Sequence, residues 1–161
     1  MKKYKLTKEV KEYGELKLHR IEALRAFGNV EKGEKGGFIE KEENLSQEGN
    51  AWVHGNAEVH GDARVYGNAR VYGDAWVYGD ARVSGNARVY GNARVYGNAR
   101  VSDNAWVSDN AWVSGDAWVS GNAKVFGELK CETGYYFARK DKEWKVEEIK
   151  VDDDNVVLWR E

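Results

Sequence analysis

The chain contains no proline, a single cysteine and no long run of apolar residues. Because proline removes a backbone hydrogen-bond donor, its absence is typical of uninterrupted strand pairing. The lone Cys131 excludes an intrachain disulfide and is compatible with a reducing compartment. No stretch reaches the length of a membrane-spanning helix, and residues 1–20 lack the apolar segment of a secretory signal. We therefore expect a cytoplasmic protein that does not enter a membrane.

An excess of charge of one sign is also missing. The 161 residues include 25 lysines and arginines and 27 aspartates and glutamates, for a formal net charge of −2. Both signs are spread along the chain, so the extended basic surface of a duplex-binding protein is absent. This balance argues against nucleic acid as a partner, and the length predicts one domain of ordinary size.

What the sequence does contain is a six-residue repeat that runs without insertion or deletion over residues 49–126. It reads Gly-Asn-Ala-x-Val-x, as in residues 67–72, with Asp in place of Asn in some copies. Ala-x-Val alternates inward, outward, inward, which is the period of a strand, and Gly with Asn or Asp forms a corner because these residues tolerate positive φ. Three units of strand and corner close a triangular coil of roughly 18 residues. The repeats therefore predict an all-β parallel β-helix of about 4.3 coils.

The stacked columns favour 18 residues per coil over a two-sided coil of 12. At a spacing of 18, one corner carries an unbroken asparagine column of Asn50, Asn68, Asn86, Asn104 and Asn122. At a spacing of 12, the same column mixes asparagine with Asp62 and Asp74. Stacked asparagine side chains can hydrogen-bond along the axis, so the pure column is the better-satisfied arrangement.

The flanks are expected to cap the coil, because a bare solenoid ends in unpaired strand edges. Residues 1–48 would form the N-terminal cap and residues 127–161 the C-terminal cap of one structural domain. In the first, residues 3–7 and 17–27 are candidate strands, and a helix over residues 10–22 is the less favoured alternative. In the second, a three-stranded β-meander is predicted over residues 134–140, 143–151 and 155–160.

An aliphatic residue followed four places on by a small one, as in Val65…Ala69 and Val71…Ala75, resembles the hexapeptide-repeat superfamily. The resemblance covers about half of the chain and implies a left-handed parallel β-helix, against the general preference for right-handed crossovers. Residues 36–40 and 43–51 also resemble the lead-in of uncharacterised bacterial and prophage-borne proteins of that superfamily. That branch implies no settled activity.

Many members of the superfamily are trimeric acyltransferases or γ-class carbonic anhydrases with sites at subunit interfaces, so an enzyme of either kind is the alternative. The metal enzymes gather three histidines at a subunit boundary. Here the repeats carry only His54 and His60, in equivalent places of successive repeats and hence on different faces. We predict no catalytic residue, no metal site and no cofactor, with Cys131 in the core of the cap. Zinc held across a subunit interface by these histidines is the remaining alternative.

The informative variation lies on the outside. Stacked every 18 residues, the mid-strand outward places form three columns: Trp52/Arg70/Arg88/Trp106/Lys124, Glu58/Trp76/Arg94/Trp112 and Arg64/Arg82/Arg100/Trp118. The next outward place adds tyrosines and serines. Stacking of arginine on tryptophan and of tyrosine on tyrosine is by itself a sufficient structural explanation of these columns.

Recognition is the alternative explanation, because Trp, Tyr and Arg dominate interface hot spots and a flat face rich in them is unusual for a solvated monomer. Such faces would pack into a trimer or dimer or dock onto a protein partner, as in a phage- or prophage-encoded inhibitor of a host protein. We therefore predict a non-catalytic scaffold or protein-interaction module. Its candidate binding residues are Arg64, Arg70, Trp76, Arg82, Arg88, Arg94, Arg100, Trp106, Trp112, Trp118, Tyr72, Tyr78, Tyr90 and Tyr96.

Overall fold

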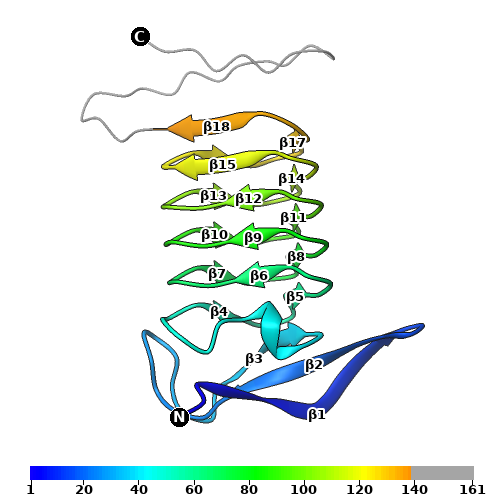
Figure 1. The fold of residues 1–161 in the computed structure, drawn as a ribbon, viewed down its shortest axis with the longest axis vertical. Coiled ribbons are helices and arrows are strands. Elements are labelled where there is room, and N and C mark those ends of the chain that lie inside the picture. The colour runs from blue at the N-terminus through cyan, green and yellow to red at the C-terminus, as the bar shows by residue number, and fades with distance from the viewer. Residues whose placement is uncertain (139–161) are drawn as a thin grey trace.

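The computed structural model describes residues 1–138 as a parallel β-solenoid with a long β-hairpin at its N-terminal end (Figure 1). The hairpin consists of β1 (Tyr4–Tyr13) and β2 (Leu16–Ala23), and β3 (Lys35–Ile39) and the 3₁₀ turn η1 (Glu42–Asn44) lead into the coil. Strands are thus confirmed at both predicted places, although β1 continues to Tyr13 and β2 ends at Ala23, so residues 24–27 are not part of it. The alternative helix over residues 10–22 is wrong. Within residues 1–138, no helical segment has the length and hydropathy of a transmembrane span.

Most strands of the coil are two residues long and consist of the outward residue and the valine of one repeat. They are β4 (Trp52–Val53), β5 (Glu58–Val59), β6 (Arg64–Val65), β7 (Arg70–Val71), β8 (Trp76–Val77), β9 (Arg82–Val83), β10 (Arg88–Val89), β11 (Arg94–Val95), β12 (Arg100–Val101), β13 (Trp106–Val107), β14 (Trp112–Val113), β15 (Trp118–Gly121), β16 (Lys124–Val125), β17 (Lys130–Cys131) and β18 (Tyr135–Ala138).

The strands stack into three sheets, and each repeat strand pairs in parallel with the strand three repeats away. Arg88 lies opposite Arg70 on one side and Trp106 on the other, so each step is 18 residues. The predicted triangular coil is confirmed, and the two-sided coil of 12 residues is excluded. The hand of the coil stays a prediction from the family resemblance.

The coil has about six turns, more than the 4.3 that the repeats predict. At the N-terminal end β3 pairs with β5, and Leu45 forms a bridge with Val65. At the C-terminal end Cys131 of β17 lies opposite Val113, and β18 pairs with β15. These outer rungs need only backbone pairing and an apolar inward residue, so they continue the coil without the repeat sequence.

The predicted strand over residues 134–140 therefore exists as β18, but it lies parallel to β15 as part of the coil. The other two strands of the predicted meander, over residues 143–151 and 155–160, lie outside the described residues.

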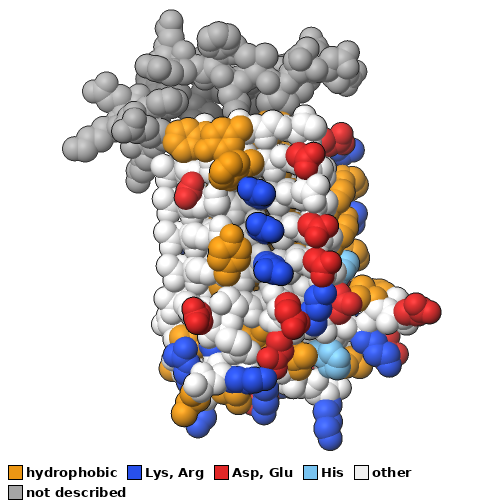
Figure 2. Space-filling model, in the orientation of Figure 1, with side chains coloured by type: hydrophobic (Ala, Val, Ile, Leu, Met, Phe, Trp, Pro, Cys, Tyr) orange, Lys and Arg blue, Asp and Glu red, His pale blue; other side chains and the backbone are white. Residues whose placement is uncertain are grey.

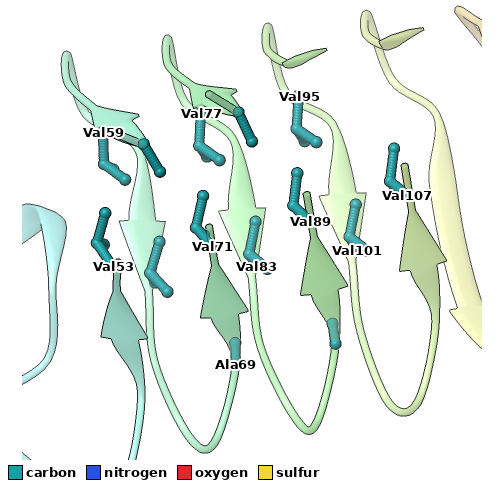
Figure 3. Close-up of a cluster of buried hydrophobic side chains, with 14 of the residues drawn as sticks. Val53, Val59, Ala69, Val71, Val77, Val83, Val89, Val95, Val101 and Val107 are labelled. Atoms are coloured by element: carbon teal, nitrogen blue, oxygen red, sulfur yellow. The ribbon is translucent and has the colours of Figure 1, made fainter. Parts of the chain in front are cut away.

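Valine and alanine fill the lumen of the coil. The alanine and valine of every repeat from Ala51 to Val119 are fully buried. Figure 3 shows Val53, Val71, Val89 and Val107 in one line along the axis, with the valines of the other two sheets facing them. Burying one valine side chain contributes about 2 kcal/mol, so the lumen is the main apolar core.

The asparagine column forms the predicted hydrogen-bond ladder. Asn50 Nδ2 donates to Asn68 Oδ1 at 3.0 Å, and Asn68 Nδ2 donates to Asn86 Oδ1 at 3.2 Å. Asn86 then donates to Asn104 at 3.1 Å. Asn68 and Asn86 thus each donate to one neighbouring coil and accept from the other, and the ladder runs from Asn50 to Asn104. Asn98 also donates to Asp116 at 3.0 Å, so a mixed step can form the same bond.

The N-terminal residues are anchored beneath the first repeat by two buried polar side chains. Tyr4 OH donates to the backbone oxygen of Leu45 at 2.6 Å, and Lys3 Nζ donates to that of Ala51 at 2.9 Å. Both side chains are fully buried, and the Lys3 ammonium lies 5.0 Å from the centre of the Phe27 ring. Burial, with a smaller contribution from Arg25, lowers the pKa of Lys3 to about 8. Burial, with nearby Glu42 and Glu43, raises the pKa of Tyr4.

We expect these two groups to make stability depend on pH. Between pH 8 and 10 the unfolded chain holds the Lys3 proton more tightly than the folded chain, so the free energy of unfolding rises by about 2 kcal/mol. Above about pH 10 the unfolded Tyr4 ionises first, so stability falls again. Urea denaturation at pH 7.5 to 11 measures this. Lys3→Met should flatten the rise, and an equal rise in that variant would contradict the assignment.

Candidate interaction surface

The three sheets give the molecule three outer faces. The first face is made by β4, β7, β10, β13 and β16, the second by β3, β5, β8, β11, β14 and β17, and the third by β6, β9, β12, β15 and β18. The three predicted outward columns lie one on each face, in the predicted register. The structure therefore divides the candidate residues among three separate surfaces.

The first face is largely satisfied by its own contacts. The Tyr72 and Tyr90 rings stack at 5.1 Å with an interplanar angle of 2°. The Trp106 ring lies 5.1 Å from the Arg88 guanidinium and 4.8 Å from the Lys124 ammonium. These contacts are the stacking that the sequence predicts for this face, and they favour a structural role for its ladder.

The N-terminal end of the first face is covered. The Trp52 side chain, which the column places outward, is fully buried under the rings of Tyr4 and Phe27, at 6.1 and 5.3 Å. The lowest rung of the first face is therefore core and not accessible surface.

The second face carries the most complete ladder. The Arg94 guanidinium lies between two indole rings, 5.3 Å from Trp76 and 5.1 Å from Trp112. Beside it, the Tyr78 ring stacks on Tyr96 at 4.9 Å and on His60 at 5.1 Å. Each aromatic group has a partner in the next coil, so this column too is explained by stacking.

The β1–β2 hairpin contacts the second face near its base and projects sideways beyond the coil (Figure 1). Lys11 Nζ and Tyr13 OH both donate to Glu58 Oε1, at 2.7 and 2.9 Å. Only 3% of the Glu58 side chain is exposed. The hairpin thus converts an outward glutamate into a buried, paired one, and Tyr13 also contacts Trp76 with ring centres 6.4 Å apart.

The third face differs from the other two. Its arginines, Arg64, Arg82 and Arg100, are exposed, and no carboxylate of the described residues lies within 4 Å of any of them. Figure 2 shows this face as a column of blue side chains beside a column of red ones, with orange side chains next to it and above it. The arginine column is therefore a row of exposed positive charges one rung apart, and the last of them, Arg100, lies 5.8 Å from the centre of the Trp118 ring.

Exposed aromatic rings flank that row. Tyr66 and Trp118 are each 41% exposed, and Tyr135 and Phe137 continue the face with 58% and 50% exposure. Trp118 Nε1 donates to Ser102 Oγ at 3.1 Å, which fixes the indole beside the arginines. Half of the large apolar side chains that are exposed within residues 1–138 thus lie on this one face.

The third face is also hollowed. Serines replace the tyrosines of the other faces at Ser84 and Ser102. Two shallow hollows follow, one lined by Tyr66, Arg82, Ser84, Arg100, Ser102 and Trp118, and one lined by Glu43, Ser46, Arg64, Val65, Tyr66 and Arg82. The two hollows share Tyr66 and Arg82, so together they form a trough along the axis with guanidinium groups on its floor. Trp118 lies at one end, Tyr66 midway, and Glu43 with Ser46 at the other end.

The two histidines and the cysteine considered for catalysis do not line the trough. His54 and His60 follow strands of different sheets, as predicted, and the pKa of each is lowered by burial, so both are neutral near pH 7. Cys131 is buried in β17, and this burial raises the pKa of its thiol. Within residues 1–138, no three histidine, cysteine or acidic side chains gather as metal ligands would.

Of the predicted binding residues, only Arg64, Arg82, Arg100 and Trp118 come together on the third face. Sequence reasoning did not select Tyr66, Ser84 and Ser102, which complete the trough. The signal for them was an earlier change from tyrosine to serine in this outer column, at Ser84, whereas the other two columns change only at Ser108 and Ser114.

Comparison with known proteins supports the architecture. A family model described as the YdcK Beta solenoid repeat matches residues 63–79, 81–95 and 93–109. These segments lie in the coil and together span less than half of the chain, so they indicate a β-solenoid repeat protein. A search of curated proteins finds no match to the chain.

Proposed function

We propose that this protein is a non-catalytic β-solenoid scaffold that binds another protein through its third face. The observation that carries the proposal is the concentration of exposed aromatic rings and unpaired arginines on one of three faces built from the same repeat. On the other two faces Arg88 and Arg94 lie over indole rings and the tyrosines stack on one another. On the third face Arg100 lies 5.8 Å from the Trp118 ring, whereas Arg64 and Arg82 have no such contact among the described residues.

The energetics of the third face support binding. Tryptophan, tyrosine and arginine contribute most of the affinity in protein interfaces, and Tyr66, Arg82, Arg100 and Trp118 lie side by side here. A rigid coil holds them in place before a partner arrives, so little conformational entropy is lost on binding. His54 lies 3.7 Å from Glu34, and the His60 ring stacks on Tyr78. These contacts support the non-catalytic part of the proposal.

The partner is either a second copy of the chain or a different protein. Face-to-face packing into a dimer or trimer is the first form, and an inhibitor of a host protein encoded by a phage or prophage is an example of the second. Light scattering on the purified protein separates the two, because only self-association raises the mass above 18.3 kDa.

Site-specific photo-crosslinking tests the face itself. Arg82 and Arg88 are exposed arginines of successive repeats, on the third and first faces respectively. With a benzophenone amino acid at one position or the other, we expect adducts in the native host from position 82 only. Adducts of twice the chain's mass would identify a second copy. Equal adducts from both positions, or adducts from position 88 alone, would contradict the proposal.

A further inference from the structure

We infer that the partner of the third face is an acidic α-helix lying along the axis of the coil. This inference rests on the proposed function and specifies the chemistry of the partner. It is argued from the charge of the trough, the spacing of its arginines and the position of Trp118.

The charge of the trough selects carboxylates. Arg64, Arg82 and Arg100 present three exposed guanidinium groups on successive rungs, without a carboxylate of the described residues within 4 Å. A guanidinium group recognises a carboxylate through two parallel hydrogen bonds. Three acidic side chains in a row therefore complement this floor.

The spacing of the arginines selects a helix. Neighbouring rungs are about 4.8 Å apart, so the column from Arg64 to Trp118 has positions at roughly 0, 4.8, 9.6 and 14.4 Å. Residues i, i+3, i+7 and i+10 of an α-helix lie at about 0, 4.5, 10.5 and 15 Å along its axis. In an extended peptide, side chains on one side recur about every 6.8 Å. The fourth such side chain would therefore lie several ångströms beyond Trp118, the fourth position of the column.

Trp118 and the side chains that line the trough are also compatible with a helix. Trp118 follows Arg100 in the column and is half-exposed, so it offers an apolar contact to the fourth residue of the row. The small Ser84 and Ser102 leave room for a helix to settle beside the arginines, and Tyr66, which lines both hollows, offers a second aromatic contact midway along the trough. Glu43 and Ser46 line the end opposite Trp118, so the acidic row fits best beside Arg82 and Arg100.

The adjoining corner restricts the partner further. The corner two residues before the arginines stacks as Asp62, Asp80, Asn98 and Asp116 along the edge of the third face. Asp62 is paired with Lys41 at 2.7 Å, and Asn98 Nδ2 donates to Asp116 Oδ1 at 3.0 Å. The carboxylates of this corner, Asp80 and Asp116 above all, repel a partner that is acidic all round and attract a basic row beside the acidic one. The preferred helix therefore carries a stripe of acidic residues bordered by lysines.

The probe is a stapled helical peptide of lysine and alanine with three glutamates at successive i, i+3, i+7 positions and a leucine at each end of that row. The leucines let it bind in either direction. Its control is an isomeric peptide of equal helicity with the glutamates on three different sides. Fluorescence anisotropy at 50 mM salt should show the striped peptide binding at least about tenfold more tightly than its isomer.

Two matched variants test the site. Arg82→Glu should weaken binding of the striped peptide by about tenfold or more, and Arg88→Glu, on the first face, should leave it unchanged. Thermal melts of both variants report whether the coil is intact. Equal binding of the two peptides, equal loss in the two variants, or tighter binding of a single-stranded oligonucleotide would each overturn the inference.

The two proposals fail separately. Photo-crosslinks from position 82 without preference for the striped peptide would leave the third face as the binding surface and remove the acidic helix. A lack of third-face crosslinks would remove the proposed function, together with the inference that rests on it.

Discussion

Replacing Gly85 with alanine is expected to lower the free energy of unfolding by about 3 kcal/mol. Gly85 has a φ of +63°, and a Cβ atom added to it would lie 2.7 Å from the backbone nitrogen of Asp103 in the next coil. Asp103 belongs to a stacked rung in which its backbone oxygen accepts from Asn86 N at 2.6 Å, so its backbone cannot move without disturbing that bond. Urea denaturation followed by circular dichroism measures the loss.

Gly55 provides the matched control. Its φ is +60°, but the nearest atom to an added Cβ is Gly73 O at 3.7 Å, an ordinary contact. Gly55→Ala therefore carries only the backbone strain, about 1 kcal/mol. Equal losses in the two variants would show that the close approach of the coils at Gly85 is not the source of the effect.

Replacing Lys11 with methionine is expected to destabilise the protein by about 3 kcal/mol. The change leaves the carboxylate of Glu58 buried without its cation, with only the Tyr13 hydroxyl as a donor. The loss should fall mainly on the attachment of the hairpin to the second face. Urea denaturation gives the global value, and hydrogen exchange of the β1 and β2 amides shows where the opening occurs.

The double variant Lys11→Met/Glu58→Leu separates a broken ion pair from lost packing. It removes both charges, so it should recover most of the stability lost by Lys11→Met alone. Lys17→Met, which breaks the exposed pair with Glu12, should change the free energy of unfolding by less than about 0.5 kcal/mol. A double variant as unstable as the single one would refute the argument from the buried charge.

The repeat made the coil itself predictable. Alanine and valine at fixed places require a lumen, and the asparagine column by itself favours a coil of 18 residues over one of 12. Both conclusions depend on contacts between residues one coil apart, and a strict repeat identifies those residues directly. The outer rungs do not obey the repeat, so Ile39, Leu45 and Cys131 were not recognised as parts of the coil.

The difference between the faces could not be predicted from the columns alone. Trp52 and Glu58 look like members of outward ladders, but the N-terminal residues bury both. Which face is left free depends on how a non-repeating segment folds back over a repeating one. Only the substitution of serine for tyrosine at Ser84 and Ser102 hinted that the third face is built differently.

Because every column recurs after 18 residues, the coil can become longer or shorter by whole turns without a change in its surface pattern. Gain or loss of three repeats would change its height by one rung, roughly 4.8 Å, and keep each surface's chemistry where it is. Gain or loss of a single repeat would turn everything above it by a third of a revolution and scatter the arginine row over different sides. Copy number can therefore vary in whole turns without altering what the surface presents.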